Sequence, residues 1–396
     1  MSILYFYKEH NFLMIMLFIR SLFKRKSMIN FKQQYVILLI SLWHFSLYGQ
    51  EDKTLAPKYS NEFLAIGVGA DALGMANAVV AQTNNVNSGY WNPAGLIGVN
   101  KWLDVGFMHA EFFAGIAKYD YLGLAHRVDD KSTLGFSVLR FAVDDIPNTT
   151  QLIDNLGNVD YDRITTFTAA DYAFLLSYAR KTKIEGLNVG GNFKVIYRQI
   201  GDFAKSYGFG LDAGAQYSIK NKWKFGLVAR DVTSTFNAWV FSLDEATKEV
   251  FLATGNALPE NGLELTLPRL ILAGYRKVDI TKSGLYAAAE VDLNITTDGK
   301  RNVLVKSDVF SVDPHVGIAV GFKEFVTVRA GVSNMQYVKN FDDSEALNVQ
   351  PNIGIGLNIK NFHLDYAFTD IGDASVALYS HVVSLRIGLD KPKNMK

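Results

Sequence analysis

The stretch from Tyr207 to Tyr217, YGFGLDAGAQY, decides the fold class. Apolar residues occupy every second position, and glycine, Asp212 and Gln216 stand between them. Successive side chains of a β-strand point to opposite faces, so the pattern predicts a strand with one apolar and one polar face. Tyrosine ends the apolar face on both sides, as expected where a membrane-spanning strand meets the two bilayer surfaces. The stretch therefore predicts a transmembrane β-strand.

The same alternation recurs along the chain, for example in Leu285–Leu293, Ile353–Ile359 and Val383–Leu389, with charged residues on the polar face. We expect an all-β protein, a transmembrane barrel of about fourteen antiparallel strands. The predicted strands are Trp102–His109, Gly115–Val128, Ser132–Ala142, Thr166–Arg180, Leu187–Gln199, Ser206–Lys220, Trp223–Val232, Leu267–Val278, Gly284–Thr296, Val309–Phe322, Val326–Ser333, Val349–Lys360, Phe362–Thr369 and His381–Leu389.

The connections between these strands alternate in length. Short links such as 129–131 and 323–325 are followed by long ones such as 143–165 and 233–266. Bacterial outer-membrane barrels join their strands with short periplasmic turns and longer external loops. We therefore expect the barrel at 102–390, a periplasmic tail at 391–396 and both termini in the periplasm.

The N-terminus indicates export. Residues 28–49 have a basic start and an apolar core, Tyr35–Leu47, as in a signal peptide. Residues 1–27 are interpreted as an upstream extension, with translation starting at Met28; the alternative is an extended signal peptide or an anchor. No apolar run after residue 50 is long enough for a transmembrane helix. We expect localisation in the bacterial outer membrane, with its lipid as a partner.

Composition argues against several function classes. The net charge is +1, and no basic stripe with interleaved aromatic residues predicts nucleic-acid binding. The chain has no cysteine, which excludes disulfides and thiolate metal sites. It also lacks a nucleophile elbow, a zinc-protease helix and a phosphate-binding loop. We expect no enzymatic activity, no cofactor and no metal.

Residues 50–101 separate the signal peptide from the first strand and are predicted to fold as a periplasmic hatch inside the lumen. Their glycine and small residues allow close backbone approach, and Asn92-Pro93 favours a turn. This turn is either a mobile hinge or a rigid turn that starts the wall. The hatch motif consists of Trp91, Asn92, Pro93, Ala94 and Gly95.

The hatch carries a resemblance to a known family. Tyr90-Trp-Asn-Pro-Ala-Gly-Leu96 looks like the hatch of FadL-type barrels. Phe63-Leu-Ala-Ile66 and Ala72-Leu-Gly-Met-Ala-Asn-Ala78 are closer to the PorV/PorQ family of type IX secretion proteins within that superfamily. Ala76, Asn77 and the non-aromatic strand end Leu389 differ from that family, which points to a paralogue.

Charged residues of both signs are predicted to face the lumen. They form either a network that fills the interior and holds the hatch, because buried charges need partners, or the lining of a polar path. The set comprises Lys194, Arg198, Asp212, Arg230, Glu290, Asp292, Arg329, Asp365 and Arg386.

The long connection Thr233–Thr266 is rich in aromatic residues and is predicted to be an external loop. Its Phe236, Trp239, Phe241 and Phe251 are candidates for contact with a partner or a hydrophobic ligand. In the alternative, the loop folds over the mouth and buries them.

Two functions from different classes follow. The resemblance implies a PorV/PorQ-like interaction protein that binds type IX secretion cargo, its C-terminal domains or other components of that system through external loops. The alternative is a FadL-like transporter of hydrophobic small molecules across the outer membrane.

Overall fold

The computed structural model describes residues 60–153, 157–220, 222–339, 343–369 and 379–392. The predicted upstream extension (1–27), the signal peptide (28–49) and the first ten residues of the hatch (50–59) lie outside the described residues, as does most of the predicted tail (393–396).

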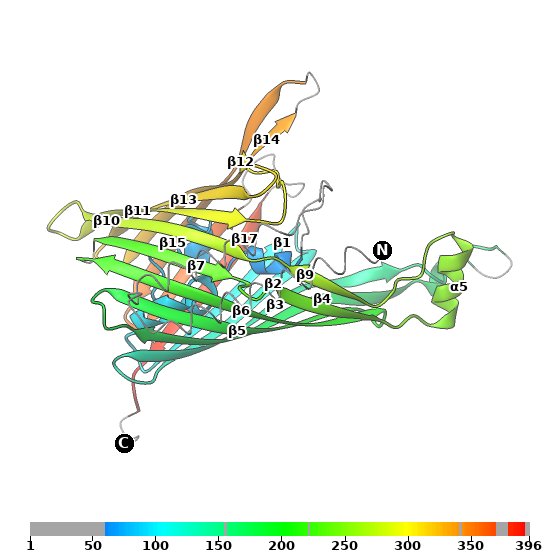
Figure 1. The fold of residues 1–396 in the computed structure, drawn as a ribbon, viewed down its shortest axis with the longest axis horizontal. Helices are drawn as coiled ribbons and strands as arrows, with labels where there is room; N and C mark the ends of the chain where they lie inside the picture. The colour runs from blue at the N-terminus through cyan, green and yellow to red at the C-terminus, as the bar shows by residue number, and fades with distance from the viewer. Residues whose placement is uncertain (1–59, 154–156, 221, 340–342, 370–378, 393–396) are drawn as a thin grey trace, which may run out of the picture. The chain divides into compact units, whose positions relative to one another are not determined.

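One antiparallel sheet forms the wall (Figure 1). It closes on itself because β1 pairs with both β2 and β17. Seventeen strands are found in the described residues; β8, β9 and β12 only extend or flank others, which leaves fourteen wall strands. The wall strands are β1 Leu103–Phe112, β2 Ala117–Arg127, β3 Ser132–Asn148, β4 Thr165–Lys181, β5 Leu187–Ile200, β6 Ala204–Ile219, β7 Trp223–Arg230, β10 Arg269–Asp279, β11 Leu285–Thr296, β13 Ser311–Phe322, β14 Val326–Lys339, β15 Glu345–Ile359, β16 Phe362–Thr369 and β17 Ser380–Leu389.

Each wall strand overlaps one predicted strand, so the fold class is confirmed. Alternate side chains are buried and exposed along the wall, as in β6, where apolar residues such as Phe209 and Leu211 face outward. The strand ends also differ in their connections. We call the end with links such as 128–131 the short-turn end, and the end with links such as 149–164 the long-loop end.

The predicted loop 233–266 is not a loop throughout, which corrects the prediction. It contains β8 (Thr235–Phe241), α5 (Glu245–Ala253) and β9 (Gly262–Thr266). β8 pairs with β6 and β9, so it continues the wall beyond β7. The strand pairing is interrupted between β7–β10 and β8–β9. Arg230 pairs with Arg269 and Thr235 pairs with Thr266, so residues 231–234 of one chain segment and Leu267-Pro268 of the other lie unpaired between them. Two smaller elements complete the long-loop end, η3 (Tyr161–Arg163) and β12 (Val305–Lys306).

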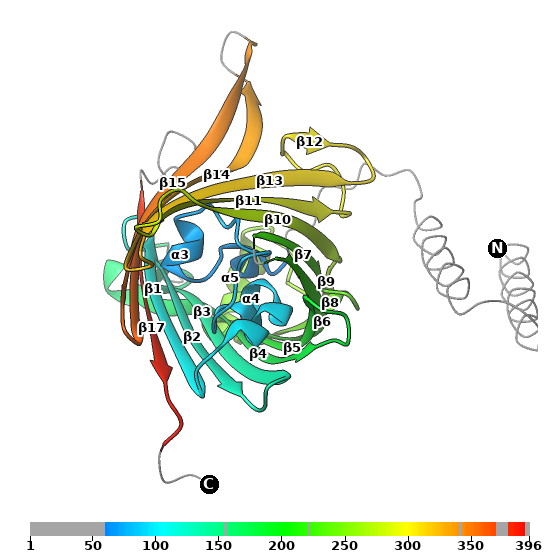
Figure 2. The ribbon, with the colours of Figure 1, turned by 90° about the vertical axis from the view of Figure 1, so that its left-hand side faces the viewer.

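Four short helices fill the lumen and form the plug, defined here as residues 60–98 (Figure 2). They are η1 Glu62–Ala65, α3 Ala70–Leu73, α4 Ser88–Trp91 and η2 Pro93–Gly98. None of the described helices is long and apolar enough to cross a membrane.

Inward-facing glycines let the plug touch the wall. A side chain at Gly331 of β14 would collide with the backbone of Met75 and Ala76, and one at Gly190 of β5 with the backbone of Pro93. Glycine is the residue that permits such close approach. The other inward glycines in contact with the plug are Gly106, Gly123, Gly135, Gly214, Gly226, Gly317 and Gly354.

Candidate functional site

The hatch motif lies deep in the lumen. Asn92 is fully buried and caps η2, because its Oδ1 accepts a hydrogen bond from the Ala94 N–H at 3.2 Å. Its Nδ2 donates to Val80 O in the plug at 3.1 Å and to Ala215 O in β6 at 3.0 Å. Trp91 donates to Val68 O at 2.8 Å. This is the geometry of a rigid turn fixed to the wall, and β1 begins only at Leu103, well after the motif.

Wall carboxylates accept hydrogen bonds from the plug backbone. Asp292 accepts from the N–H groups of Val79 and Val80 at 3.0 and 3.1 Å, and Glu290 accepts from that of Ala81 at 2.5 Å. These two buried carboxylates therefore have plug amides as their hydrogen-bond donors, where we expected basic side chains. They hold the 79–81 turn against β11.

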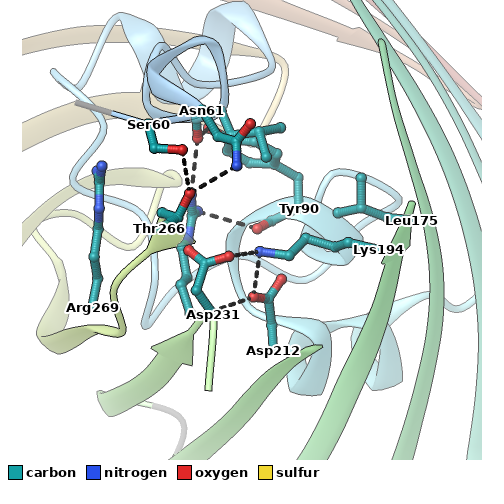
Figure 3. A pocket seen from close by; sticks show the side chains of 11 residues that line it. Ser60, Asn61, Tyr90, Leu175, Lys194, Asp212, Asp231, Thr266 and Arg269 are labelled. Carbon is teal, nitrogen blue, oxygen red and sulfur yellow. Dashed lines mark hydrogen bonds and ion pairs between the residues drawn. The ribbon is translucent and has the colours of Figure 1, made fainter. Parts of the chain in front are cut away.

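A buried ion triad lies beside the break between β7 and β8 (Figure 3). Lys194 Nζ is 2.8 Å from Asp212 Oδ1 and 2.5 Å from Asp231 Oδ1. The Asp231 N–H and the Thr235 hydroxyl also donate to these two carboxylates. Because the triad is nearly inaccessible to solvent and fully bonded, it stabilises the irregular backbone at this point.

The remaining predicted lumen charges also point inward. Arg230 donates to Leu64 O and Tyr90 O, both at 3.2 Å, and its guanidinium lies 4.6 Å from the Tyr90 ring centre. The other four form ion pairs: Arg198 pairs with Asp171 and Glu264, and Asp365 pairs with Arg329 and Arg386, the latter of which also pairs with Asp71. Arg230 and Arg386 contact the plug directly. No group of three His, Asp or Glu in the described part of the chain is arranged to hold a metal ion.

An aromatic cluster lies above the plug at the long-loop end. Tyr119 packs edge-on against Phe112 and Phe141, with ring centres 6.5 and 6.2 Å apart. The same hydrophobic core includes Phe63 of the plug. Leu64, Ile66, Phe141 and Val143 pack against this core and are only partly buried. This cluster was not predicted from the sequence. In β2, aromatic residues alternate with Lys118 and Asp120, but here the aromatic side chains face the lumen, whereas in β6 they face outward.

The aromatic residues predicted in the long loop separate into three places. Phe236 faces outward from β8 and packs against Phe209, with ring centres 5.9 Å apart, so it is a wall residue and not a loop contact. Trp239 and Phe241 lie on the opposite face of β8; Trp239 donates to Glu264 at 3.0 Å and stacks with Phe241. Phe251 is half-buried in α5. These four residues therefore do not form one contact surface.

Comparison with known proteins identifies a shared architecture. No family model and no curated protein sequence matches the chain. Among solved structures, the CymD monoaromatic hydrocarbon channel superposes with a TM-score of 0.51 at 13% identity, over 82% of this chain and 98% of that one. The two proteins share one fold.

Other FadL-type barrels are less similar in backbone. The toluene transporter TbuX of Ralstonia pickettii has a TM-score of 0.48 at 12% identity, covering 82% of this chain and 98% of TbuX. A FadL homologue of Pseudomonas aeruginosa has a TM-score of 0.45 at 10% identity, covering 85% and 99%. Assignment to the PorV/PorQ family stays a prediction.

Proposed function

We propose that this protein is a non-enzymatic outer-membrane channel for a small hydrophobic molecule, with its long-loop end outside the cell and both termini in the periplasm. The observation that carries the proposal is the aromatic cluster at the long-loop end. The interior of a porin-type barrel is polar because it holds water. Here the partly buried Leu64 and Ile66 of the plug and Phe141 and Val143 of the wall offer an apolar surface at the long-loop side of the plug.

The break in the wall supplies an exit. Between Arg230–Arg269 and Thr235–Thr266 the strands lose their regular hydrogen bonds, and Pro268 has no N–H to donate. Val232 and Leu267 are exposed on the outer surface at this point. In this proposal a hydrophobic molecule leaves sideways into lipid at the break, past the buried Lys194–Asp212–Asp231 triad and without crossing the plug.

Uptake of a labelled monoaromatic hydrocarbon tests the proposal, since the similar fold of CymD belongs to a channel for this class. Cells that produce the protein should take up toluene faster than cells without it, and Phe141→Asp should reduce the gain at least fivefold. Phe322→Asp at the short-turn end of β13, which faces outward, controls for a damaged barrel. Equal uptake with and without the protein would refute the proposal for this class of solute.

A second candidate, binding of type IX secretion cargo or components, is favoured by two extensions at the long-loop end. The β8–α5–β9 segment and the β14–β15 hairpin both project beyond the wall (Figure 1). Exposed apolar residues on the hairpin include Tyr337, Val338 and Leu347. Replacing residues 242–261 with a short glycine-serine link should abolish cargo recovery in a gentle pull-down under this candidate and leave hydrocarbon uptake intact.

A further inference from the structure

A network of charged residues lies on the outward face of β1 to β4, near the long-loop end. His109 Nδ1 is 2.7 Å from Asp120, Arg140 is 3.3 Å from Asp120, and Lys118 is 3.2 Å from Asp144. Inward neighbours such as Met108, Tyr119, Tyr121 and Leu139 are buried, which places these charges on the outer side of the wall. The full network comprises His109, Glu111, Lys118, Asp120, Arg140, Asp144, Thr168 and Tyr172.

The charged network occupies part of the outer surface that is apolar on other strands. On β6 the outward apolar residues run from Tyr207 to Ile219, but on β1 they run only from Leu103 to Phe107. At about 3.3 Å per residue and a tilt of about 40°, the β1 run spans roughly 13 Å, half of the ~25 Å apolar band of such barrels. The charges therefore stand where other parts of this wall face hydrocarbon. The ion pairs within the network leave its side chains 30–55% exposed, so at that depth they need further polar neighbours from outside the wall.

An apolar hollow adjoins the network on its short-turn side. Outward residues of β17, β1, β2 and β3 line it, and His109, Asp120 and Arg140 form its polar edge. Its outward apolar lining consists of Phe107, Leu122, Val138, Val383 and Leu385, and the inward Met108 and Tyr121 also border it. A hollow that joins an apolar floor to a charged edge matches a molecule with a hydrocarbon chain and a polar headgroup.

The chemistry and width of the network select among headgroups. Its three carboxylates accept hydrogen bonds, and Arg140 and Lys118 offer positive charge, so the headgroup must combine donors with anionic acceptors. The network reaches across four neighbouring strands, about 14 Å at the usual strand spacing. A single phosphate with an amine covers less than this width, whereas a phosphorylated sugar headgroup supplies hydroxyl donors and phosphate acceptors across it.

We propose that this face binds a glycolipid with a phosphorylated sugar headgroup: one acyl chain lies in the hollow and the headgroup covers the charged network. The inference rests on the proposed outer-membrane location with the long-loop end outside, but not on transport. Phosphate oxygens accept from Arg140, and sugar hydroxyls donate to Asp120 and Glu111. The apolar band on β1 is short because the lipid headgroup lies at the depth of the charged network.

Native mass spectrometry tests this site. The protein is placed in vesicles of phosphatidylethanolamine with a small fraction of lipid A, a phosphorylated and acylated diglucosamine, and the lipids that remain bound are counted. We expect lipid A to be enriched at least tenfold over phosphatidylethanolamine. Arg140→Leu removes the guanidinium and Leu122→Trp fills the hollow with the network intact, and each should lower bound lipid A at least fivefold.

Matched changes on β6 serve as controls, because Lys205 and Leu211 also face outward. Lys205→Leu and Leu211→Trp should leave bound lipid A within twofold of the unchanged protein. The proposal is overturned by equal retention of both lipids, by equal losses in the controls, or by cross-linking through His109→Cys that shows a second copy on this face. Binding is measured without uptake, so failure of the channel proposal gives a different result.

Discussion

At the scale of single residues, Asn92 shows how one side chain fixes the plug. Its amide bonds to the plug at Val80 and Ala94 and to the wall at Ala215, and none of it is exposed. A buried polar group left without its partner costs about 1–3 kcal/mol. The residue therefore joins the plug to β6, in addition to starting the η2 turn.

Replacing Asn92 with Asp keeps the size of the side chain and its acceptor but removes both donors, and it places a carboxylate against two carbonyl oxygens. We expect the free energy of unfolding to fall by about 2 kcal/mol or more. Urea unfolding in vesicles measures this change. Asn256→Asp, at an exposed position after α5, should have almost no effect, and an equal loss at both positions would contradict the role assigned to Asn92.

Gly331→Leu tests the close contact between plug and wall. The new side chain would collide with the backbone of Met75 and Ala76, which are both buried. We expect the plug to be displaced and to become sensitive to protease while the barrel still resists heat in detergent. Gly274→Leu is the control, because nothing lies within 4 Å of a side chain added there. Protease resistance in both variants would mean that the plug tolerates this intrusion.

At the scale of elements, a loop at the long-loop end holds the start of the plug. Arg301 lies 2.5 Å from Asp298 and 3.3 Å from Glu62 of η1, and Arg269 of β10 lies 2.6 Å from the same Glu62. Burial alone would raise the pKa of the Asp298 carboxyl, but hydrogen bonds and charge from Arg301 outweigh it and lower that pKa. The loop, η1 and β10 thus form one ion-pair cluster.

A lowered pKa fixes the direction of the pH dependence. Asp298 stabilises the folded protein above the ordinary carboxyl pKa of about 4, and this contribution disappears as the pH falls through its lower folded value. Asp298→Asn should therefore reduce the unfolding temperature at pH 7 and have little effect near pH 2. Thermal unfolding of both proteins across this range measures the difference. A gap that stays constant with pH would exclude the carboxylate as its source.

At the scale of the whole molecule, the plug is bonded to the wall on many sides, so we expect a solute to leave through the break in the wall while the plug stays in place. Gly89 of α4 and Ser177 of β4 permit a test, because a Cβ added at Gly89 would lie 3.8 Å from that of Ser177, the usual spacing in a disulfide. Uptake by the Gly89→Cys/Ser177→Cys protein should stay within twofold after oxidation. Loss of uptake that a reductant restores would show that the plug must move.

The wall could be predicted from the sequence because period-two alternation is local and recurs in every strand. The plug geometry could not, since Asn92 meets Ala215 and the 79–81 turn meets Glu290 only after the chain has folded. The fourteen wall strands were predicted, whereas β8 and β9 were hidden in a long connection. The sequence also did not predict the charged outer face of β1 to β3, because the strands with the clearest alternation, such as β6, carry their charges on the inner face.

The pairing of β1 with β17 closes the barrel by joining its first and last strands, and the plug forms hydrogen bonds with both of them. The Val86 N–H binds Asp104 and the Gly69 N–H binds Met108 on β1, while the Ala70 N–H binds Ser384 on β17. The plug is made before either strand, so it can capture β1 early and then shorten the search by which the last strand finds the first. A segment that blocks the pore thus also acts as the template on which the cylinder is assembled.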